Sequence, residues 1–270
     1  MRLRVSHRTV YRFEQPIRGV LQSHRLRPAD NDGQRVLSWS VTVEGGETGA
    51  AFRDGAGDWI ETVSLRGEVD GVVVAVAGEV ETQDQSGVLR GHREQVHPAV
   101  YLRPARSTAP DHALRELARA AVAEQDSPLA RAHALSAAVS AAVAYRPGET
   151  DAATSAAEAL EQGRGVCQDM AHILIAAAIA ADIPARYVAG YLYSDVADGM
   201  AEASHAWAEL HVPGLGWVGF DPANECCPDA RYIRLGSGFD ALDAAPIRGV
   251  ARGQTTEHLD VEVSVGQVQQ

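Results

Sequence analysis

Residues 163–181 read GRGVCQDMAHILIAAAIAA, and this stretch decides how the chain is interpreted. A glycine-rich turn ends at Val166, and an apolar run long enough for a helix follows from Met170. Cys167 therefore lies where the turn meets the helix. Free backbone N–H groups at a helix N-terminus carry partial positive charge, which stabilises a thiolate and can stabilise an oxyanion on a substrate carbonyl. The position of Cys167 thus indicates an activated thiol.

Two later segments supply the partners that a thiol nucleophile needs. His205 lies at the start of the predicted strand SHAWAE, and Asp221 ends a second predicted strand, GWVGFD. An imidazole moves the thiol proton, and a carboxylate on its other nitrogen fixes the tautomer and the orientation of the ring. The order Cys167, His205, Asp221, with separations of 38 and 16 residues, predicts a catalytic triad.

Four segments carry a resemblance to a known family. They are VSHRTVYRFEQPIRGVLQSHRLRP (5–28), GVCQDMAHILIAAAIAADIPARYVAGYL (165–192), SHAWAELHVPGLGWVGFDPAN (204–224) and RYIRLGSGFDALDAAPIRGV (231–250). The last three resemble bacterial transglutaminase-like proteins, which are relatives of papain-type cysteine peptidases. The first is similar to the amino-terminal domain that usually precedes that catalytic domain. The resemblance implies acyl chemistry at Cys167, with His205 and Asp221 as its partners, on a peptide or amide substrate and without a cofactor.

The hydrophobic pattern predicts an α+β fold. Its period is mostly two up to about residue 80, which predicts a β-sandwich-like amino-terminal domain over 1–85, followed by a connector over 86–110. A papain/transglutaminase-like catalytic domain with a carboxy-terminal strand extension then covers 111–270. Within it we expect helices over 111–123, 128–144, 154–162 and 167–181, capped at Asp111, Ser127 and Thr154, and then strands over 185–192, 205–212 and 217–220. Helices followed by an antiparallel sheet are typical of α+β folds.

Composition excludes several classes of function. A net charge of −12 disfavours nucleic-acid binding, which requires clustered cations. No apolar stretch approaches the roughly 20 residues of a membrane span. We expect a cytoplasmic protein, because the first residues contain no apolar signal segment and three cysteines, two of them adjacent, form a poor disulfide framework. A homodimer is compatible with the sequence.

Several further residues have an expected place near the triad. Gln168, Tyr191 and Trp207 are predicted to contact substrate. His172 is five residues after Cys167 on the same helix, so it points away from the thiol and is expected to pack or to line the substrate side. Asp169 is expected to cap the first helical turn. No metal site is predicted, because HExxH and paired CxxC motifs are absent.

Three functions remain open from the sequence. A hydrolase would pass the acyl group from Cys167 to water, and a transglutaminase-type acyltransferase would pass it to an amine. A binding or assembly module would keep the fold without chemistry, although the intact set of Cys167, His205 and Asp221 counts against it. Hydrolysis is the preferred hypothesis, because no sequence feature marks an amine site.

Overall fold

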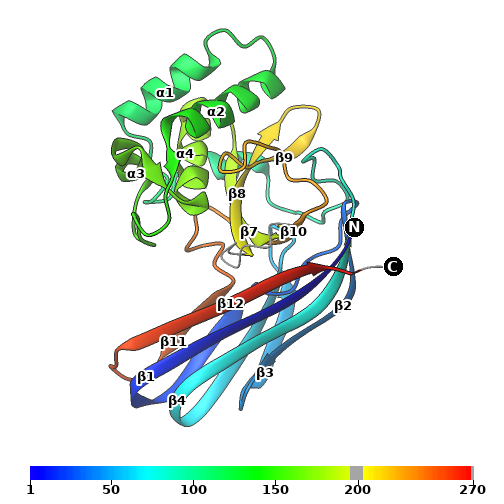
Figure 1. Ribbon diagram of the computed structural model, residues 1–270, viewed down its shortest axis with the longest axis vertical. Helices are drawn as coiled ribbons and strands as arrows, with labels where there is room; N and C mark the ends of the chain where they lie inside the picture. Colours follow the sequence, from blue (N-terminus) through cyan, green and yellow to red (C-terminus); the bar gives the residue numbers. More distant parts are fainter. Residues whose placement is uncertain (195–202, 269–270) are drawn as a thin grey trace.

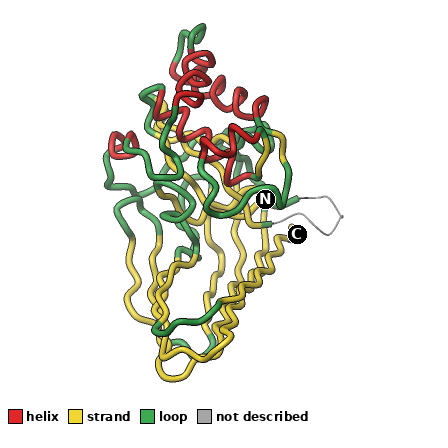
Figure 2. The backbone as a smooth tube through the Cα atoms, turned by 90° about the vertical axis from the view of Figure 1, so that its left-hand side faces the viewer, coloured by secondary structure: helices red, strands yellow, loops and turns green. Residues whose placement is uncertain are grey.

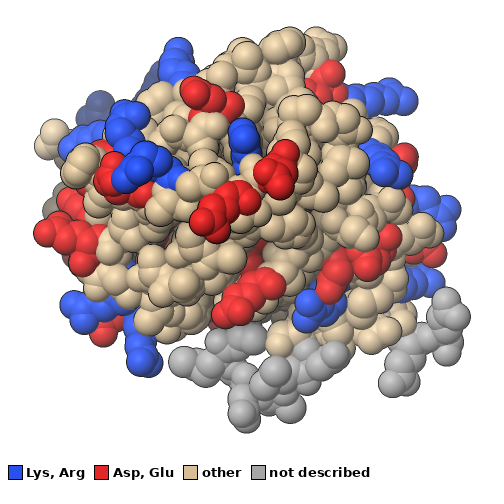
Figure 3. Space-filling model, turned by 90° about the horizontal axis from the view of Figure 1, so that it is seen from above, with Lys and Arg blue, Asp and Glu red and all other residues tan. Residues whose placement is uncertain are grey.

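The computed structural model describes residues 1–194 and 203–268. Four helices lie at one end of the molecule, above a four-stranded sheet, and a large sheet of long strands forms the other end (Figure 1). The view from the side shows the same division into a helical end and a strand-rich end (Figure 2). Seen from above the helices, acidic and basic side chains are interspersed over the surface (Figure 3). The arrangement confirms the predicted α+β class.

The large sheet is built around two long antiparallel strands, and each of them has a different outer neighbour in its first and second halves. Its strands are β1 (Arg2–His24), β2 (Gln34–Val43), β3 (Glu47–Arg53), β4 (Trp59–Thr82), β11 (Ile247–Ala251) and β12 (Glu257–Gln267). The first half of β1 pairs with β12 and its second half with β11, while β4 pairs first with β3 and then with β2. The β1–β4 register shifts between Arg12 and Gly19, where β1 passes from one set of partners to the other. Apolar side chains from the second half of β1 and from β4 form one buried core, and Leu3, Val5 and Val80 at the other end of these strands form a separate cluster with residues of the second sheet.

The last two strands, β11 and β12, complete this amino-terminal sheet. Both pair with β1, so the carboxy-terminal end of the chain returns to the region in which the chain begins. A strand extension is predicted here, but as part of the catalytic domain, whereas both strands pair with β1. Alternating apolar and polar side chains predict a strand but do not predict which strand it pairs with. The pairing with β1 is therefore known only from the structure. The boundaries at residues 85 and 110 remain predictions.

The four helices occur where the sequence predicts them. They are α1 (His112–Val122), α2 (Pro128–Ala142), α3 (Ala156–Gln162) and α4 (Cys167–Ala180), and a short 3-10 helix η1 (Pro98–Leu102) precedes them. Asp111 and Ser127 cap α1 and α2 as expected. The predicted cap Thr154 is wrong, because Ser155 accepts from the Glu158 N–H while the Glu158 carboxylate accepts from the Ser155 N–H. The three-residue spacing of Ser155 and Glu158 permits this reciprocal pair.

Helix α4 packs against the second sheet. That sheet has the order β10 (Tyr232–Gly238), β7 (Ala185–Leu192), β8 (Ser204–Val212) and β9 (Gly216–Phe220), and all of its pairs are antiparallel. Nearly every residue of α4 from Asp169 to Ala178 is buried, as expected of a helix that is apolar on all sides. Along β8, Ala206, Ala208 and Leu210 join the helical core, so His205 and Trp207 point to the opposite face.

A buried ionic network joins this sheet to the rest of the chain. Arg186 donates to Glu209 and Glu94 at 2.7 Å each, and Arg234 donates to Glu209 at 2.9 Å and to Asp58 at 2.6 Å. Strands β7, β8 and β10 are thereby tied to the loop before β4 and to the connector. Burial opposes ionisation of Glu209, but the two guanidinium groups outweigh it and lower its pKa to about 2. The Glu209 carboxylate is therefore ionised at neutral pH and is bonded to the guanidinium groups of Arg186 and Arg234.

Candidate active site

The turn before Cys167 is fixed by two glycines and a short strand pair. Gly163 ends α3 with φ 65°, a left-handed conformation that favours glycine. A side chain at Gly165 would lie within 2.8 Å of Asp169, so only glycine fits that close approach. Strand β6 (Arg164–Gly165) pairs in parallel with β5 (Ala144–Tyr145), which follows α2. The chain therefore enters α4 at a defined angle, and Cys167 is the first helical residue.

Asp169 secures this helix start, as the sequence predicts. Its Oδ2 accepts from the backbone N–H of Val166 at 2.8 Å and from the hydroxyl of Thr150 at 2.6 Å. The side chain is 1% exposed, so both bonds are shielded from water. The carboxylate complements the helix N-terminus and holds the loop that contains Thr150 against it.

His205 and Asp221 form the contact that the order of the residues predicts. Nε2 of His205 lies 2.6 Å from Oδ2 of Asp221. Because β8 and β9 are antiparallel neighbours, the start of β8 lies beside the end of β9, and the two side chains meet there. The other neighbour of the imidazole is Cys167, whose interaction with the ring helps to raise the pKa of His205. The structure thus brings Cys167, His205 and Asp221 together.

Asp221 is held by more donors than the sequence analysis anticipated. Its Oδ2 also accepts from the Tyr232 hydroxyl and from Nδ2 of Asn224, each at 2.7 Å. Its Oδ1 accepts from the backbone N–H groups of Ala223 and Asn224 at 3.0 and 3.3 Å. Asn224 follows Asp221 in the quoted DPAN sequence, so spacing could have suggested it. Tyr232 comes from β10, and the sequence carries no signal that places its hydroxyl here.

The electrostatics of His205 favour its charged form. Burial opposes protonation of the ring, but hydrogen bonds to Asp221 and Cys167 and the charge of Asp221 outweigh burial, and the pKa of His205 is raised to about 9. The pKa of Asp221 is lowered despite burial, chiefly through its bond to His205. At neutral pH the site therefore contains an imidazolium between a carboxylate and a cysteine sulfur. An adjacent imidazolium stabilises a thiolate.

The other two cysteines have different surroundings. Burial raises the pKa of Cys227 to about 11, and burial also raises the pKa of Cys226. Sγ of Cys226 lies 3.3 Å from the Tyr232 hydroxyl. Since the Tyr232 hydroxyl also donates to Asp221, the Cys226 thiol adjoins the hydrogen-bond network of the site.

Two of the three predicted substrate residues are buried and need correction. Tyr191 is 1% exposed, and its hydroxyl lies 2.7 Å from Nδ1 of His7 in the apolar cluster between the two sheets. Trp207 is 2% exposed, stacks beside His205 and meets the edge of Tyr232. Both aromatic rings belong to the core, where aromatic side chains on strands usually lie. Gln168 is half-buried in the first turn of α4, and its contact with substrate stays a prediction.

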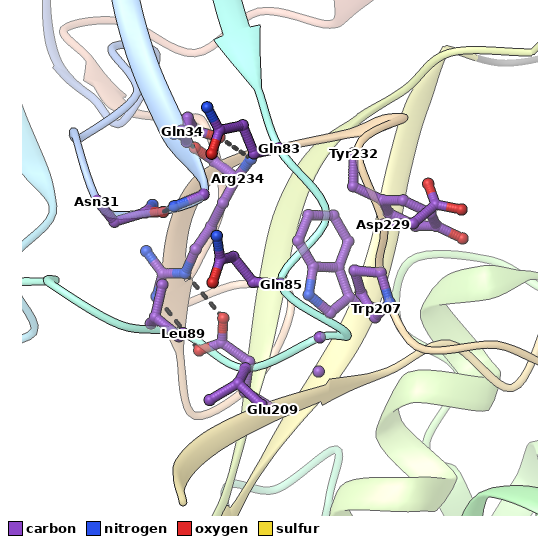
Figure 4. Close-up of a pocket in the computed structure, with 15 residues that line it drawn as sticks. Asn31, Gln34, Gln83, Gln85, Leu89, Trp207, Glu209, Asp229, Tyr232 and Arg234 are labelled. Carbon is purple, nitrogen blue, oxygen red and sulfur yellow. Dashed lines mark hydrogen bonds and ion pairs between the residues drawn. The ribbon is translucent and has the colours of Figure 1, made fainter. Parts of the chain in front are cut away.

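Trp207 also lines a small pocket behind the site. Figure 4 shows Gln85 of the connector and the Arg234–Glu209 ion pair on the same side of its indole ring. The pocket has a volume of about 70 Å³. Ligand sites usually measure several hundred Å³, so this pocket is too small for a peptide side chain and its backbone.

His172 packs in the core, one of its two predicted places. It is 1% exposed, its Nε2 accepts from the backbone N–H of Ala241 at 3.0 Å, and its ring lies against Tyr187. Burial lowers its pKa to about 4. His172 is therefore neutral and holds the segment after β10 against α4.

Two family models match the chain. A model of the bacterial transglutaminase-like N-terminal region matches residues 3–81, and a model of the transglutaminase-like superfamily matches residues 115–222. The chain belongs to the transglutaminase-like superfamily. The matched core of this transglutaminase-like chain contains Cys167, His205 and Asp221.

Relatives of this transglutaminase-like protein occur in mycobacteria. An uncharacterized protein of Mycobacterium leprae is 28% identical over 293 residues, covering 98% of each chain. An uncharacterized protein of Mycobacterium tuberculosis is 38% identical over 130 residues, covering 45% of this chain and 41% of the relative. The crystal structure of a proposed cysteine protease from Cytophaga hutchinsonii is similar over 100% of this chain and 92% of that one, with a TM-score of 0.76 and 22% identity. This likeness shows the shared fold.

No helix among the described residues has the length and apolar character to cross a bilayer.

Proposed function

We propose that the protein is a cysteine-dependent hydrolase of amide or peptide bonds that acts through a Cys167–His205–Asp221 triad and a thioester intermediate. The observation that carries the proposal is the 2.6 Å bond between His205 Nε2 and Asp221 Oδ2, on an imidazole whose pKa is also raised by its neighbour Cys167. Asp221 is fully buried and held by four further donors, so the ring has a fixed tautomer and orientation. This fixed His205–Asp221 pair beside Cys167 supports a role for the three side chains in nucleophilic catalysis.

Acylation follows from this arrangement. The Cys167 thiolate attacks the carbonyl carbon, and the electron pair of the C=O bond moves to oxygen. Helix starts have N–H groups without a partner inside the helix, and the proposed donor to that oxyanion is the N–H of Cys167, the first residue of α4. The intermediate collapses, the C–N bond breaks, and the amine leaves with a proton from the His205 imidazolium. The acyl group then remains on sulfur as a thioester.

Deacylation reverses the proton movements. Neutral His205 takes a proton from water, and the resulting hydroxide attacks the thioester carbonyl. The C–S bond breaks, the product leaves as a carboxylic acid, and the thiolate is restored beside an imidazolium. Asp221 keeps its charge throughout and orients the ring.

Water is the proposed acceptor because the carboxylates of the site are already engaged. Asp221 binds His205, and Asp169 binds the Val166 N–H and Thr150. Both carboxylates are also buried, Asp169 at 1% and Asp221 at 0% exposure, so neither is accessible to an ammonium group beside Cys167. A transglutaminase-type acyltransferase, whose chemistry is the same up to the thioester, is the competing outcome of the test.

The test traps the acyl group and then partitions it. The protein is incubated with a pool of cell-derived peptides and amides, and intact mass reports an acyl adduct. The adduct should vanish in Cys167→Ala and persist in Cys227→Ala, a matched change of another half-buried cysteine. A primary amine is then added. Free acid as the main product supports the hydrolase, efficient amide formation at modest amine concentration assigns a transferase, and no adduct with any substrate class favours a binding module.

A further inference from the structure

The large sheet carries a groove, and the residues that line it are distant in sequence from Cys167, His205 and Asp221. It is formed by the second half of β1, the adjoining part of β4 and the end of β11, and its volume is about 610 Å³. We call it the basic groove and define it by Arg18, Gly19, Leu21, Arg66, Val250 and Arg252. Pockets of this volume accommodate ligands or short chain segments.

The hollow of the basic groove is centred on Gly19. Gly19 pairs with Arg66 on β4, and on its other side its carbonyl accepts from the Arg252 N–H at 2.9 Å. Gly19 has φ 146°, and a Cβ there would lie 2.8 Å from the Leu65 carbonyl, so no side chain fits. Arg66 and Arg252 therefore lie on either side of a residue that has no side chain. Since neighbouring strands are about 4.8 Å apart, the Cα atoms of the two arginines are about 10 Å from each other. Two guanidinium groups can therefore converge on one anion.

The surroundings of the hollow are apolar and cationic. Leu21 and Val250 are 54% and 67% exposed, and they are cross-strand neighbours beside the arginine row. Within the described part of the chain, Arg18 and Arg252 make no ion pair, and Arg66 has only a loose one with Glu47 at 3.9 Å. In a chain of net charge −12, this local excess of positive charge next to exposed aliphatic side chains fits an anionic group joined to apolar side chains.

The rim of the groove is the free edge of a strand. Among the described strands, β11 pairs only with β1. The Pro246 carbonyl accepts from Arg25 N–H at 2.7 Å, and Arg252 exchanges bonds with Arg18 and Gly19, so alternate residues from 246 to 252 face β1. The backbone groups of the residues between them, including Gly249 and Ala251, point away from the sheet. Both are exposed and small, so they leave room for another extended chain.

We propose that the basic groove binds an extended peptide segment of a partner protein, in which an acidic residue stands two positions from an aliphatic one. The peptide backbone pairs with the outer edge of β11. Residues two apart share one face of a strand, so the aliphatic side chain covers Val250, which adjoins Leu21, while the carboxylate reaches Arg252 and is attracted by the more distant Arg66 of β4. Backbone pairing favours a peptide over a lipid, because a lipid would leave the donors and acceptors of Gly249 and Ala251 unused.

Selection from a displayed library of random hexapeptides tests this assignment. The full chain should enrich peptides with Asp or Glu two positions from Val, Ile or Leu. A fluorescein-labelled consensus peptide should then bind with an anisotropy change that weakens as salt rises. Arg66→Gln and Arg252→Gln should each weaken binding about fivefold, and Arg8→Gln, an exposed arginine of β1 outside the groove, should leave it unchanged.

A second arm examines the strand edge. Gly249→Pro removes one outward N–H, and a consensus peptide N-methylated at alternate residues removes the matching donors; each should weaken binding at least tenfold, with folding checked by circular dichroism. The proposal is overturned if the library shows no acidic enrichment, if the Arg66→Gln/Arg252→Gln double variant selects the same peptides, or if N-methylation has no effect. Sedimentation of the chain with phosphatidylglycerol vesicles, lost in the double variant, would instead assign the groove to lipid.

Discussion

Arg234 Nη1 lies 2.6 Å from Asp58 Oδ1, although 176 residues separate the two in sequence. Asp58 is fully buried, and its other oxygen accepts from the backbone and hydroxyl of Ser237 at 2.6 and 3.0 Å. The same Arg234 binds Glu209 of β8, four residues after His205. The amino-terminal sheet is thus fastened to the strand that carries the imidazole, so damage to this contact is expected to reach the active site.

Replacement of Arg234 by Met should destabilise the protein strongly. It leaves Asp58 without its main cationic partner and Glu209 with only Arg186, and uncompensated buried charges cost about 3–5 kcal/mol. Urea unfolding at pH 7 measures the loss. The matched control is Arg35→Gln, which removes an exposed pair with Glu81 and should cost under about 1 kcal/mol. Equal losses in the two variants would contradict the importance of the buried network.

Iodoacetamide should modify Cys167 first at neutral pH. Cys167 is the first residue of α4 and adjoins His205, whereas burial raises the pKa of Cys227 to about 11 and also that of Cys226, which keeps those two thiols protonated and less reactive. Peptide mass spectrometry after limited alkylation locates the label. His205→Ala should remove this selectivity. Similar labelling of all three cysteines in the unaltered protein would count against an activated nucleophile.

Activity should fall on the alkaline side as His205 loses its proton near pH 9. The raised pKa depends on Asp221, so Asp221→Asn should move this limb toward the ordinary histidine value of about 6.5 and lower kcat/KM about 100-fold or more. A pH profile of kcat/KM for both proteins measures the shift. An unmoved alkaline limb in Asp221→Asn would assign the titration to another group.

Three buried histidines should make the fold sensitive to acid. Burial lowers the pKa values of His7, His24 and His172 to about 4, below the unfolded value of about 6.5. Each therefore contributes stability that is present above pH 6.5 and is lost as pH falls toward 4, by up to about 3 kcal/mol per group. His205 has the opposite sign, because its pKa is raised to about 9, so its contribution is present below pH 6.5 and is lost as pH rises through 9.

Urea unfolding between pH 7 and pH 4.5 measures this acid sensitivity. The free energy of unfolding should fall by about 1.4 kcal/mol per pH unit for each neutral histidine that is protonated only when unfolded. His172→Leu should lower the free energy of unfolding at pH 7, because the Ala241 N–H loses its acceptor. The variant should also show a smaller dependence of that free energy on pH, because one fewer proton is taken up on unfolding. A steeper slope in the variant would contradict the assignment of His172 as neutral.

The sequence by itself determined the helices and the identity of the candidate triad. Apolar runs with caps at Asp111 and Ser127 are local signals, and so is the glycine turn that starts α4 at Cys167. The order of cysteine, histidine and aspartate points to one chemistry, because those residue types are useful to each other only in contact. These inferences needed no knowledge of what lies across the fold.

Tertiary structure decided everything that depends on pairing between distant segments. β11 and β12 return to β1, Tyr232 of β10 reaches Asp221, and Tyr191 and Trp207 are covered by other elements although their sequence positions suggested a groove. A strand pattern specifies which side chains share a face and leaves open which surface will cover that face. Burial and partner choice are set by long-range packing, and so the roles of these side chains could be read only from the folded chain.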